Sequence, residues 1–170
     1  MLRWYLINTK PSGETVAQQN LERQGYEVYL PRLLESVRRG GCLRERIVPL
    51  FPRYLFLHLN EGSQALSPVR SSVGVLEVVR FGSAYALVPD RVIRDLQARA
   101  NAESGLHQVA RAPVLARGDS VAITQGPFDG LDGVFERQAG PDRVVVLLRL
   151  LGQAAPVHIP LDFVMRSRAA

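Results

Sequence analysis

The chain of 170 residues is 46% apolar and 22% charged with a formal net charge of +5, which is typical of a soluble globular protein of one or two small domains. No apolar run approaches the roughly 20 residues that span a bilayer, and the N-terminus lacks the basic and apolar segments of a secretory signal. The single cysteine, Cys42, excludes an internal disulfide and fits a reducing cytoplasm.

The excess positive charge is concentrated in one part of the chain. Residues 1–100 hold 14 Lys and Arg against 9 Asp and Glu, whereas residues 101–170 hold 7 of each sign. All of the excess therefore lies in the first hundred residues, which favours a polyanionic partner such as nucleic acid.

The first sixty residues contain clear element signals. We expect a strand over residues 3–8, a helix over 14–24 that ends at Gly25, a strand over 26–30, and two strand arms over 33–50. The arms enclose a tip of Arg38-Arg39-Gly40-Gly41, and the return arm carries Arg44 and Arg46. This basic hairpin is either a solvated loop or a surface that lies along phosphates.

The segment Pro49-Leu50-Phe51-Pro52-Arg53-Tyr54-Leu55-Phe56-Leu57 contains a strand that is apolar on both faces. Alternation sends Leu55 and Leu57 to one face and the two aromatic residues to the other. If one face seals the domain core, the other must be buried on something else. The pattern fits equally well a strand that is buried on both sides within one core.

The remaining pattern divides the chain into two domains. A strand over residues 75–81 closes at Gly82, and a helix over 90–100 presents Val92, Ile93 and Leu96 on one apolar face. These strands and helices predict an α+β domain over residues 1–100, an antiparallel sheet with its helices on one face.

A linker is expected over residues 101–112, with His107 at the surface. Short strands follow, and they predict a small all-β barrel over residues 113–170. We expect these strands over residues 120–124, 131–137, 144–148, 157–160 and 163–165.

No arrangement of residues typical of catalysis is present in the sequence. His58, His107 and His158 lie in unrelated segments, without a Ser/His/Asp set, paired acids, a glycine-rich phosphate loop or metal-ligand spacing. We therefore expect neither an enzyme nor a bound metal or cofactor.

Two sets of motifs resemble the NusG/RfaH family of transcription elongation factors. The first half resembles the NusG N-terminal domain through Trp4-Tyr5, the passage Leu21…Gly25-Tyr26…Leu30-Pro31, and residues 49–56. The second half resembles a KOW domain through Gly118-Asp119-Ser120-Val121, Gly126-Pro127-Phe128, Gly130, Gly133, Gly152 and Pro156-Val157. Within the family, Lys10, Leu21-Glu22-Arg23-Gln24 and Val79-Arg80-Phe81-Gly82 resemble the operon-specific RfaH type, whereas residues 157–164 resemble housekeeping NusG.

The resemblance implies that the N-terminal domain binds the clamp helices of RNA polymerase through an apolar patch. The matching positions are Tyr54, Phe56, Phe81, Ile93 and Leu96, with Arg53 and Arg80 at the rim. Aromatic anchors with an arginine rim suit an interface hot spot. The implied activity is processive elongation with suppressed pausing and termination, without bond chemistry.

RfaH-like members also read a hairpin in non-template DNA through a basic patch, which matches Lys10, Asn20, Arg23 and Ser72 here. Phosphate contacts position such a protein, and polar contacts to base edges specify the sequence. Val73 stands where the family pattern has arginine, so the DNA element is not carried over. Lys10 and Arg23 are equally consistent with ordinary surface charge.

The KOW resemblance implies contact with a small-subunit ribosomal protein and, in housekeeping members, with Rho. Leu151 matches the ribosome-contacting loop, although a leucine beside a tight turn also suits a core. We expect a monomer. Two other functions stay open, a housekeeping NusG that assists Rho and a ribosomal KOW protein that binds RNA; the neutral charge of residues 101–170 argues against the second.

RfaH-type proteins park the C-terminal domain over the polymerase site as a helical hairpin, and we predict that this chain does not. Gly130 and Gly133 weaken one candidate helix by up to ~1 kcal/mol each, and two prolines interrupt the other. Val144-Val145-Val146 favours a strand. Val48 replaces the acid that locks that closed form, whereas Arg143 retains the basic position.

Overall fold

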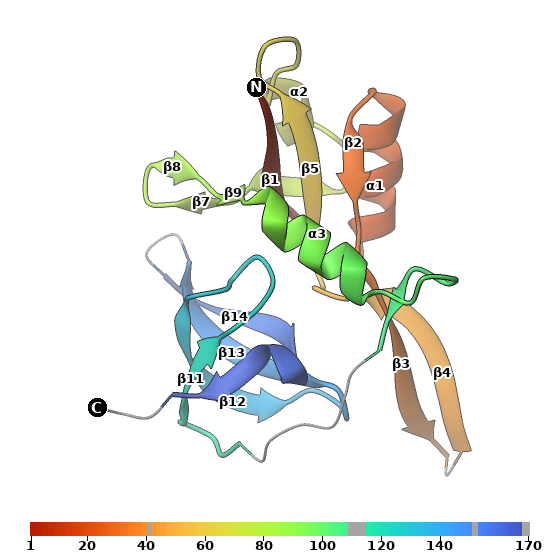
Figure 1. Ribbon diagram of the computed structural model, residues 1–170, viewed down its shortest axis with the longest axis vertical. Coiled ribbons are helices and arrows are strands. Elements are labelled where there is room, and N and C mark those ends of the chain that lie inside the picture. The colour runs from red at the N-terminus through yellow and green to blue at the C-terminus, as the bar shows by residue number, and fades with distance from the viewer. Residues whose placement is uncertain (41, 109–114, 151–152, 168–170) are drawn as a thin grey trace.

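The computed structural model describes residues 1–40, 42–108, 115–150 and 153–167. Figure 1 shows a larger N-terminal domain and a smaller C-terminal β domain, with helix α3 (Asp90–Arg99) between the N-terminal sheet and the β domain. Each domain has its own sheet, but buried residues of both belong to one continuous apolar cluster.

The N-terminal domain follows the predicted order with a few additions. Its elements are β1 (Leu2–Thr9), α1 (Glu14–Arg23), β2 (Glu27–Tyr29), β3 (Arg32–Arg39), β4 (Cys42–Pro49), β5 (Tyr54–Asn60), α2 (Ser67–Arg70), β6 (Val75–Val78), β7 (Arg80–Phe81), β8 (Ala84–Tyr85), β9 (Leu87–Val88), α3 and β10 (Leu106–His107). The strand expected over residues 75–81 is divided into β6 and β7. Helix α2 and strands β8 and β9 were not predicted, because two to four residues give too short a pattern.

The central sheet has the order β2-β5-β1-β6, and β9 also pairs with β1. All of these pairings are antiparallel, as predicted. The expectation that helices cover only one face is wrong. Helix α1 packs Ala17 and Leu21 on the face of Leu55 and Leu57, whereas α3 belongs to the cluster on the opposite face. The sheet is apolar on both faces, so each face recruits a helix.

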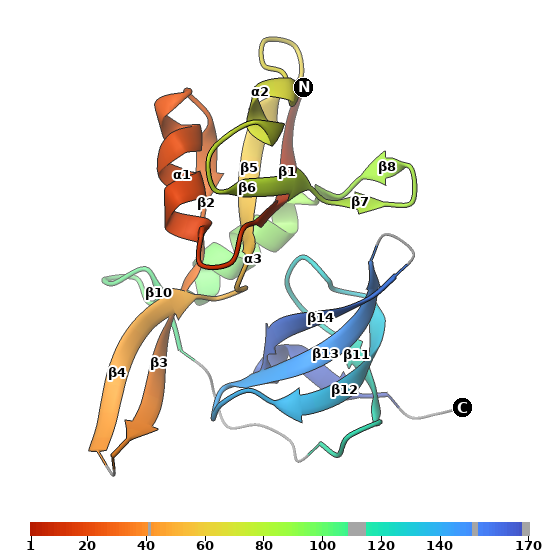
Figure 2. The ribbon, with the colours of Figure 1, turned by 180° about the vertical axis from the view of Figure 1, so that it is seen from behind.

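Strands β3 and β4 form a long hairpin that extends away from the central sheet (Figures 1 and 2). At its base, β10 pairs in parallel with β3, with Leu106 opposite Arg32 and His107 opposite Leu33. This pairing places His107 in the interior with only 5% exposure, so its predicted surface position is wrong. A polar linker pattern gave no sign of the pairing, because the partner strand lies about seventy residues earlier in the chain.

The C-terminal domain is all-β, as predicted. Its elements are β11 (Ser120–Ile123), β12 (Asp132–Gln138), β13 (Arg143–Leu150), β14 (Gln153–Pro160), the short 3-10 helix η1 (Leu161–Phe163) and β15 (Val164–Arg166). The strand order is β14-β13-β12-β11-β15, and Figure 2 shows the sheet curling on itself. A Cβ on Gly133 would lie 2.4 Å from Val146 Cγ1, so β12 passes close to β13 only because this residue is glycine.

The prediction that these residues form strands and no helical hairpin is confirmed over the described part of the domain. The run of three valines lies inside β13, and Pro156 and Pro160 lie in β14, which is an edge strand where proline is tolerated. Within the ranges that the structure describes, no helix is long and apolar enough to cross a membrane.

Candidate functional site

The aromatic face of β5 is the centre of the candidate site. Tyr54 and Phe56 lie on the face away from α1, and Ile93 and Leu96 of α3 belong to the same apolar cluster. Their exposed fractions are 9%, 0%, 2% and 2%. Four of the five positions matched to polymerase contacts are therefore brought together, and all four are buried.

Phe81, the fifth position, lies apart from that cluster. It is in the small β7–β8 hairpin and is 40% exposed. Neighbouring Arg80 lies over the Tyr85 ring, with its guanidinium carbon 4.4 Å from the ring centroid, and donates a hydrogen bond of 2.8 Å to the Tyr85 hydroxyl. This contact fixes Arg80 beside Phe81.

The C-terminal domain covers the aromatic face of β5. The Phe128 ring lies 5.4 Å from Tyr54 and 6.4 Å from Phe51 in near-perpendicular arrangements. Phe163 also packs on Phe51, with ring centroids 5.9 Å apart. Phe51 itself stands edge-on to Phe56 at 6.3 Å, so one aromatic cluster connects the sheet to the β domain.

Gly126 makes the close approach of the two domains possible. It has φ of +82°, a left-handed conformation that favours glycine. A Cβ at this position would lie 2.9 Å from Phe51 Cζ and 3.3 Å from Phe163 Cε2. The loop before Phe128 therefore requires glycine both for its backbone and for the ring that it contacts.

A buried arginine adds a polar connection between the domains. Arg143, at the start of β13, donates hydrogen bonds to the carbonyl oxygens of Leu50, at 2.9 Å, and of Pro49. Its guanidinium also lies 3.6 Å from the carboxylate of Glu35, which receives Arg46 from the hairpin at 2.7 Å. Burial lowers the pKa of Arg143 to about 10, so it remains a cation at neutral pH. The arginine retained at this position thus pairs with Glu35. In the hairpin register Val48 is opposite Leu33, which lies two residues before Glu35 on the same strand.

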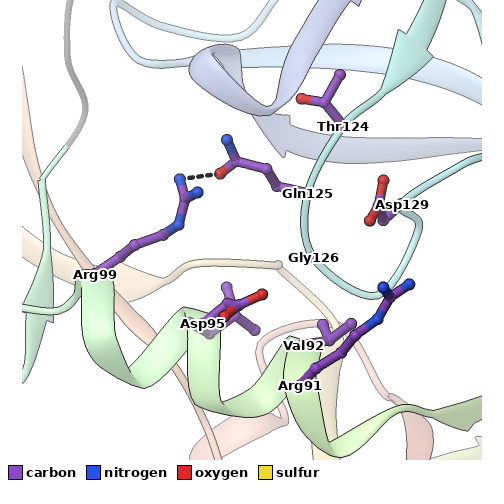
Figure 3. Close-up of a pocket in the computed structure, with 9 residues that line it drawn as sticks. Arg91, Val92, Asp95, Arg99, Thr124, Gln125, Gly126 and Asp129 are labelled. Atoms are coloured by element: carbon purple, nitrogen blue, oxygen red, sulfur yellow. Dashed lines mark hydrogen bonds between the residues drawn. The ribbon is translucent and has the colours of Figure 1, made fainter.

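A small cavity of about 130 Å³ opens where α3 meets the β domain. Figure 3 shows α3 on one side and the loop with Thr124, Gln125, Gly126 and Asp129 on the other. The Arg99 guanidinium donates a hydrogen bond across the cavity to the Gln125 side chain. Polar groups therefore rim the apolar contact, as is usual at an interface between domains.

A second cavity, of about 230 Å³, lies on the other side of Arg99 and is lined by Leu50, His107, Gln108, Pro160, Asp162 and Phe163. Among the described residues, neither His107 Nε2 nor Asp162 Oδ1 has a hydrogen-bond partner. Burial and the charge of Arg99 lower the pKa of His107, whereas burial raises the pKa of Asp162. The polar groups of this cavity are thus poorly paired.

The turn before β5 is held in an unusual conformation. Arg53 has φ of +72°, and its backbone N–H donates a 2.7 Å hydrogen bond to the buried carboxylate of Glu14. A left-handed non-glycine residue costs about 1–2 kcal/mol, which this charge-assisted bond offsets. Glu14 thereby fixes the entry of the aromatic strand against α1.

Three of the residues matched to DNA contacts, Lys10, Asn20 and Ser72, lie at one loop beside α1. The Gln24 side chain donates hydrogen bonds to Ser72 Oγ, at 2.8 Å, and to the carbonyl oxygen of Asn20, at 3.0 Å. Ser72 is only 8% exposed, and its hydroxyl donates to the Pro68 carbonyl oxygen, so it supports the loop. Lys10 is exposed, and its backbone N–H donates a hydrogen bond to the Gly74 carbonyl oxygen at 2.9 Å. The sequence pattern gave no indication that the Gln24 side chain supports Ser72.

The other expectations concern separate places. Arg23 is exposed at the end of α1, and Val73 is 65% exposed in the loop itself. Leu151, matched to ribosome contact, lies outside the described residues. Over the described ranges, no group of three or more His, Cys, Asp or Glu side chains is placed to hold a metal ion.

Comparison with known proteins identifies the family of the chain. The family model described as "Transcription termination factor nusG" matches residues 2–97, which is more than half of the chain. The chain belongs to the NusG family. It is 25% identical over 194 aligned positions to the transcription termination/antitermination protein NusG of Streptomyces griseus, covering 96% of this chain and 64% of the relative. It is 20% identical to the protein of the same name from Rickettsia conorii, covering 97% of this chain and 90% of the relative.

This NusG-family chain therefore spans 64% of the length of the Streptomyces relative and nearly the whole of the Rickettsia one. A solved structure that concerns domain interaction in Thermotoga maritima NusG aligns over 99% of this chain and 98% of its own, with 22% identity and a TM-score of 0.47.

Proposed function

We propose that this protein is a transcription elongation factor that binds the clamp helices of RNA polymerase and suppresses pausing and termination. The binding surface is the aromatic face of β5 together with α3, and the anchors are Tyr54, Phe56, Phe81, Ile93 and Leu96. Membership in the NusG family supports the class of activity. The carrying observation is that this face is buried by the loops of a second domain, through Phe128 on Tyr54.

A face covered in this way can exchange its cover for a partner of similar chemistry. The helices and sheet of the N-terminal domain hold the anchors in place, while the covering residues belong to separate loops around Gly126 and η1. Polymerase binding at this face requires the β domain to move away, which breaks the aromatic cluster and the Arg143 contacts. The free protein is accordingly in a closed form, and the active form is open.

Recruitment to particular operons would use non-template DNA on the surface of Lys10, Asn20 and Arg23. The geometry supports Lys10 and Arg23 as phosphate contacts, because both are exposed. Ser72 is buried and holds the adjoining loop in place, where its hydroxyl oxygen accepts a hydrogen bond from the exposed Gln24 side chain. The exposed Val73 at the loop tip adds an apolar contact where the family pattern has a cation.

The β domain would act as a KOW module that, once released, contacts a small-subunit ribosomal protein through Leu151. Because the β domain must first leave the closed form, contact with the ribosomal protein depends on polymerase binding. Rho is the alternative partner of the same module. Binding of Rho would make the protein a housekeeping factor.

Single-round transcription across a Rho-dependent terminator tests the proposal, using the polymerase of the source organism with Rho and housekeeping NusG present. We expect increased read-through. The variants Tyr54→Ala and Phe81→Ala should abolish the effect, whereas Val134→Ala, at a residue of 42% exposure on the β domain, should retain it. Stronger or earlier termination would establish the Rho-assisting alternative, and full activity of both anchor variants would mean that the polymerase site is elsewhere.

A further inference from the structure

The β3–β4 hairpin presents an exposed surface that the proposed contacts do not use. Each strand has eight residues, and β10 pairs only with Arg32 and Leu33 at the base. Beyond that point Arg39, Cys42, Arg44 and Arg46 are exposed. Both figures of the whole chain show the hairpin reaching past the rest of the N-terminal domain (Figures 1 and 2).

The register places three arginines of the hairpin on one face. Arg39 is opposite Cys42, Val37 is opposite Arg44, and Glu35 is opposite Arg46. Directly opposite residues of an antiparallel pair share a face, and so do residues two apart on one strand. Arg39, Arg44 and Arg46 therefore form a single arginine face, with Arg44 and Arg46 about 6.8 Å apart along β4.

The acids of the hairpin do not cancel this charge. Glu45 lies on the opposite face by alternation, and Glu35 is buried at the base, where Arg143 shares its carboxylate. Arg46 is tied to Glu35 but its side chain is 59% exposed. In the part of the chain that the structure describes, Arg39 and Arg44 form no ion pair.

We propose that the arginine face binds the phosphate backbone of double-stranded DNA. The major groove of B-form DNA, about 12 Å wide, admits a two-stranded β-ribbon, and guanidinium groups match phosphate oxygens in bidentate fashion. The major groove of A-form RNA is too deep and narrow for such a ribbon. The contacts are to phosphates and are independent of sequence, unlike those proposed for the Lys10 surface.

Fluorescence anisotropy with a short random-sequence DNA duplex at several salt concentrations tests this proposal without polymerase, so its outcome is independent of the proposed function. The double variant Arg39→Gln/Arg44→Gln should raise the dissociation constant roughly tenfold or more and reduce the salt slope by about 1.8, or 0.9 per phosphate contact. The charge-matched control Arg91→Gln/Arg94→Gln removes two exposed arginines of α3 and should bind as the wild type does. Equal loss in both variants, or tighter binding of duplex RNA than of DNA, would overturn the proposal.

A second measurement locates the DNA on the hairpin directly. Cys42 is the only cysteine of the chain, it is exposed, and it pairs with Arg39 at the tip. A photoactivatable maleimide attached there should cross-link to the duplex, and unlabelled duplex should compete. If the labelled wild type still binds DNA in the anisotropy assay but gives no adduct, the DNA lies elsewhere on the protein.

Discussion

The guanidinium of Arg143 and the carboxylate of Glu35 lie 3.6 Å apart, and both side chains are 4% exposed. They come from different domains, and 108 positions separate them in the sequence. Glu35 also receives Arg46, so a buried carboxylate is shared by two cations. The contact between Arg143 and Glu35 holds only while the domains are together, because separation exposes both of these buried groups to water.

Arg143→Ala should open the closed form. The change removes the hydrogen bonds to the Pro49 and Leu50 carbonyls and leaves Glu35 with Arg46 alone, which we expect to cost about 3 kcal/mol of interdomain stability. Small-angle X-ray scattering should show a larger radius of gyration. Arg149→Ala, on the same strand and exposed, is the control and should scatter as the wild type. Identical scattering of both variants would contradict the role of Arg143.

Alanine variants at two glycines distinguish the cost of backbone strain from the cost of disturbed packing between the domains. Gly126 and Gly130 have φ of +82° and +83°, so alanine strains the backbone equally at both. Only at Gly126 does the new Cβ meet a ring, that of Phe51 at 2.9 Å, whereas Gly130 has nothing within 4 Å. Gly126→Ala should therefore be less stable than Gly130→Ala by about 1–3 kcal/mol in urea unfolding. Equal midpoints for the two variants would show that the ring moves aside freely.

Phe51 should be the most costly aromatic residue to truncate at the contact between domains. It is 1% exposed and touches Phe56, Phe128 and Phe163. Phe51→Ala should lose about 3–5 kcal/mol, and Phe81→Ala, at a half-exposed position, less than about 1 kcal/mol. Denaturant unfolding of the two variants measures the difference. A loss at Phe51 no greater than that at Phe81 would mean that the cluster does not join the domains.

Acid should destabilise the protein through His107. Burial lowers the pKa of His107 below that of the unfolded chain, so as pH falls through about 6.5 the unfolded state takes up this proton more readily than the folded state, and stability decreases. His158, whose pKa is also lowered by burial, acts in the same direction. His107→Gln should make the unfolding free energy less dependent on pH between about 7.5 and 5.5, by up to about 1.4 kcal/mol per pH unit. An unchanged slope would mean that His107 is protonated in the folded state.

Local pattern was sufficient wherever neighbouring residues decide the structure. Alternation predicted β5 and its aromatic face, and proline and valine placement predicted strands instead of a helical hairpin in the C-terminal domain. The same reasoning failed for His107, because its burial depends on a parallel pairing with β3 that no local signal marks. It also placed both helices on one face, because the pattern of an amphipathic helix does not say which face of a two-sided sheet it covers.

By itself, then, the sequence determined the family, the order of elements and the presence of a second apolar face on β5. The tertiary structure decided what covers that face. Phe128 on Tyr54, Gly126 under Phe51 and Arg143 on the Leu50 carbonyl join segments more than seventy residues apart. Such contacts depend on the complementary shape and charge of surfaces that form only after each domain has folded, so periodicity and composition carry no trace of them.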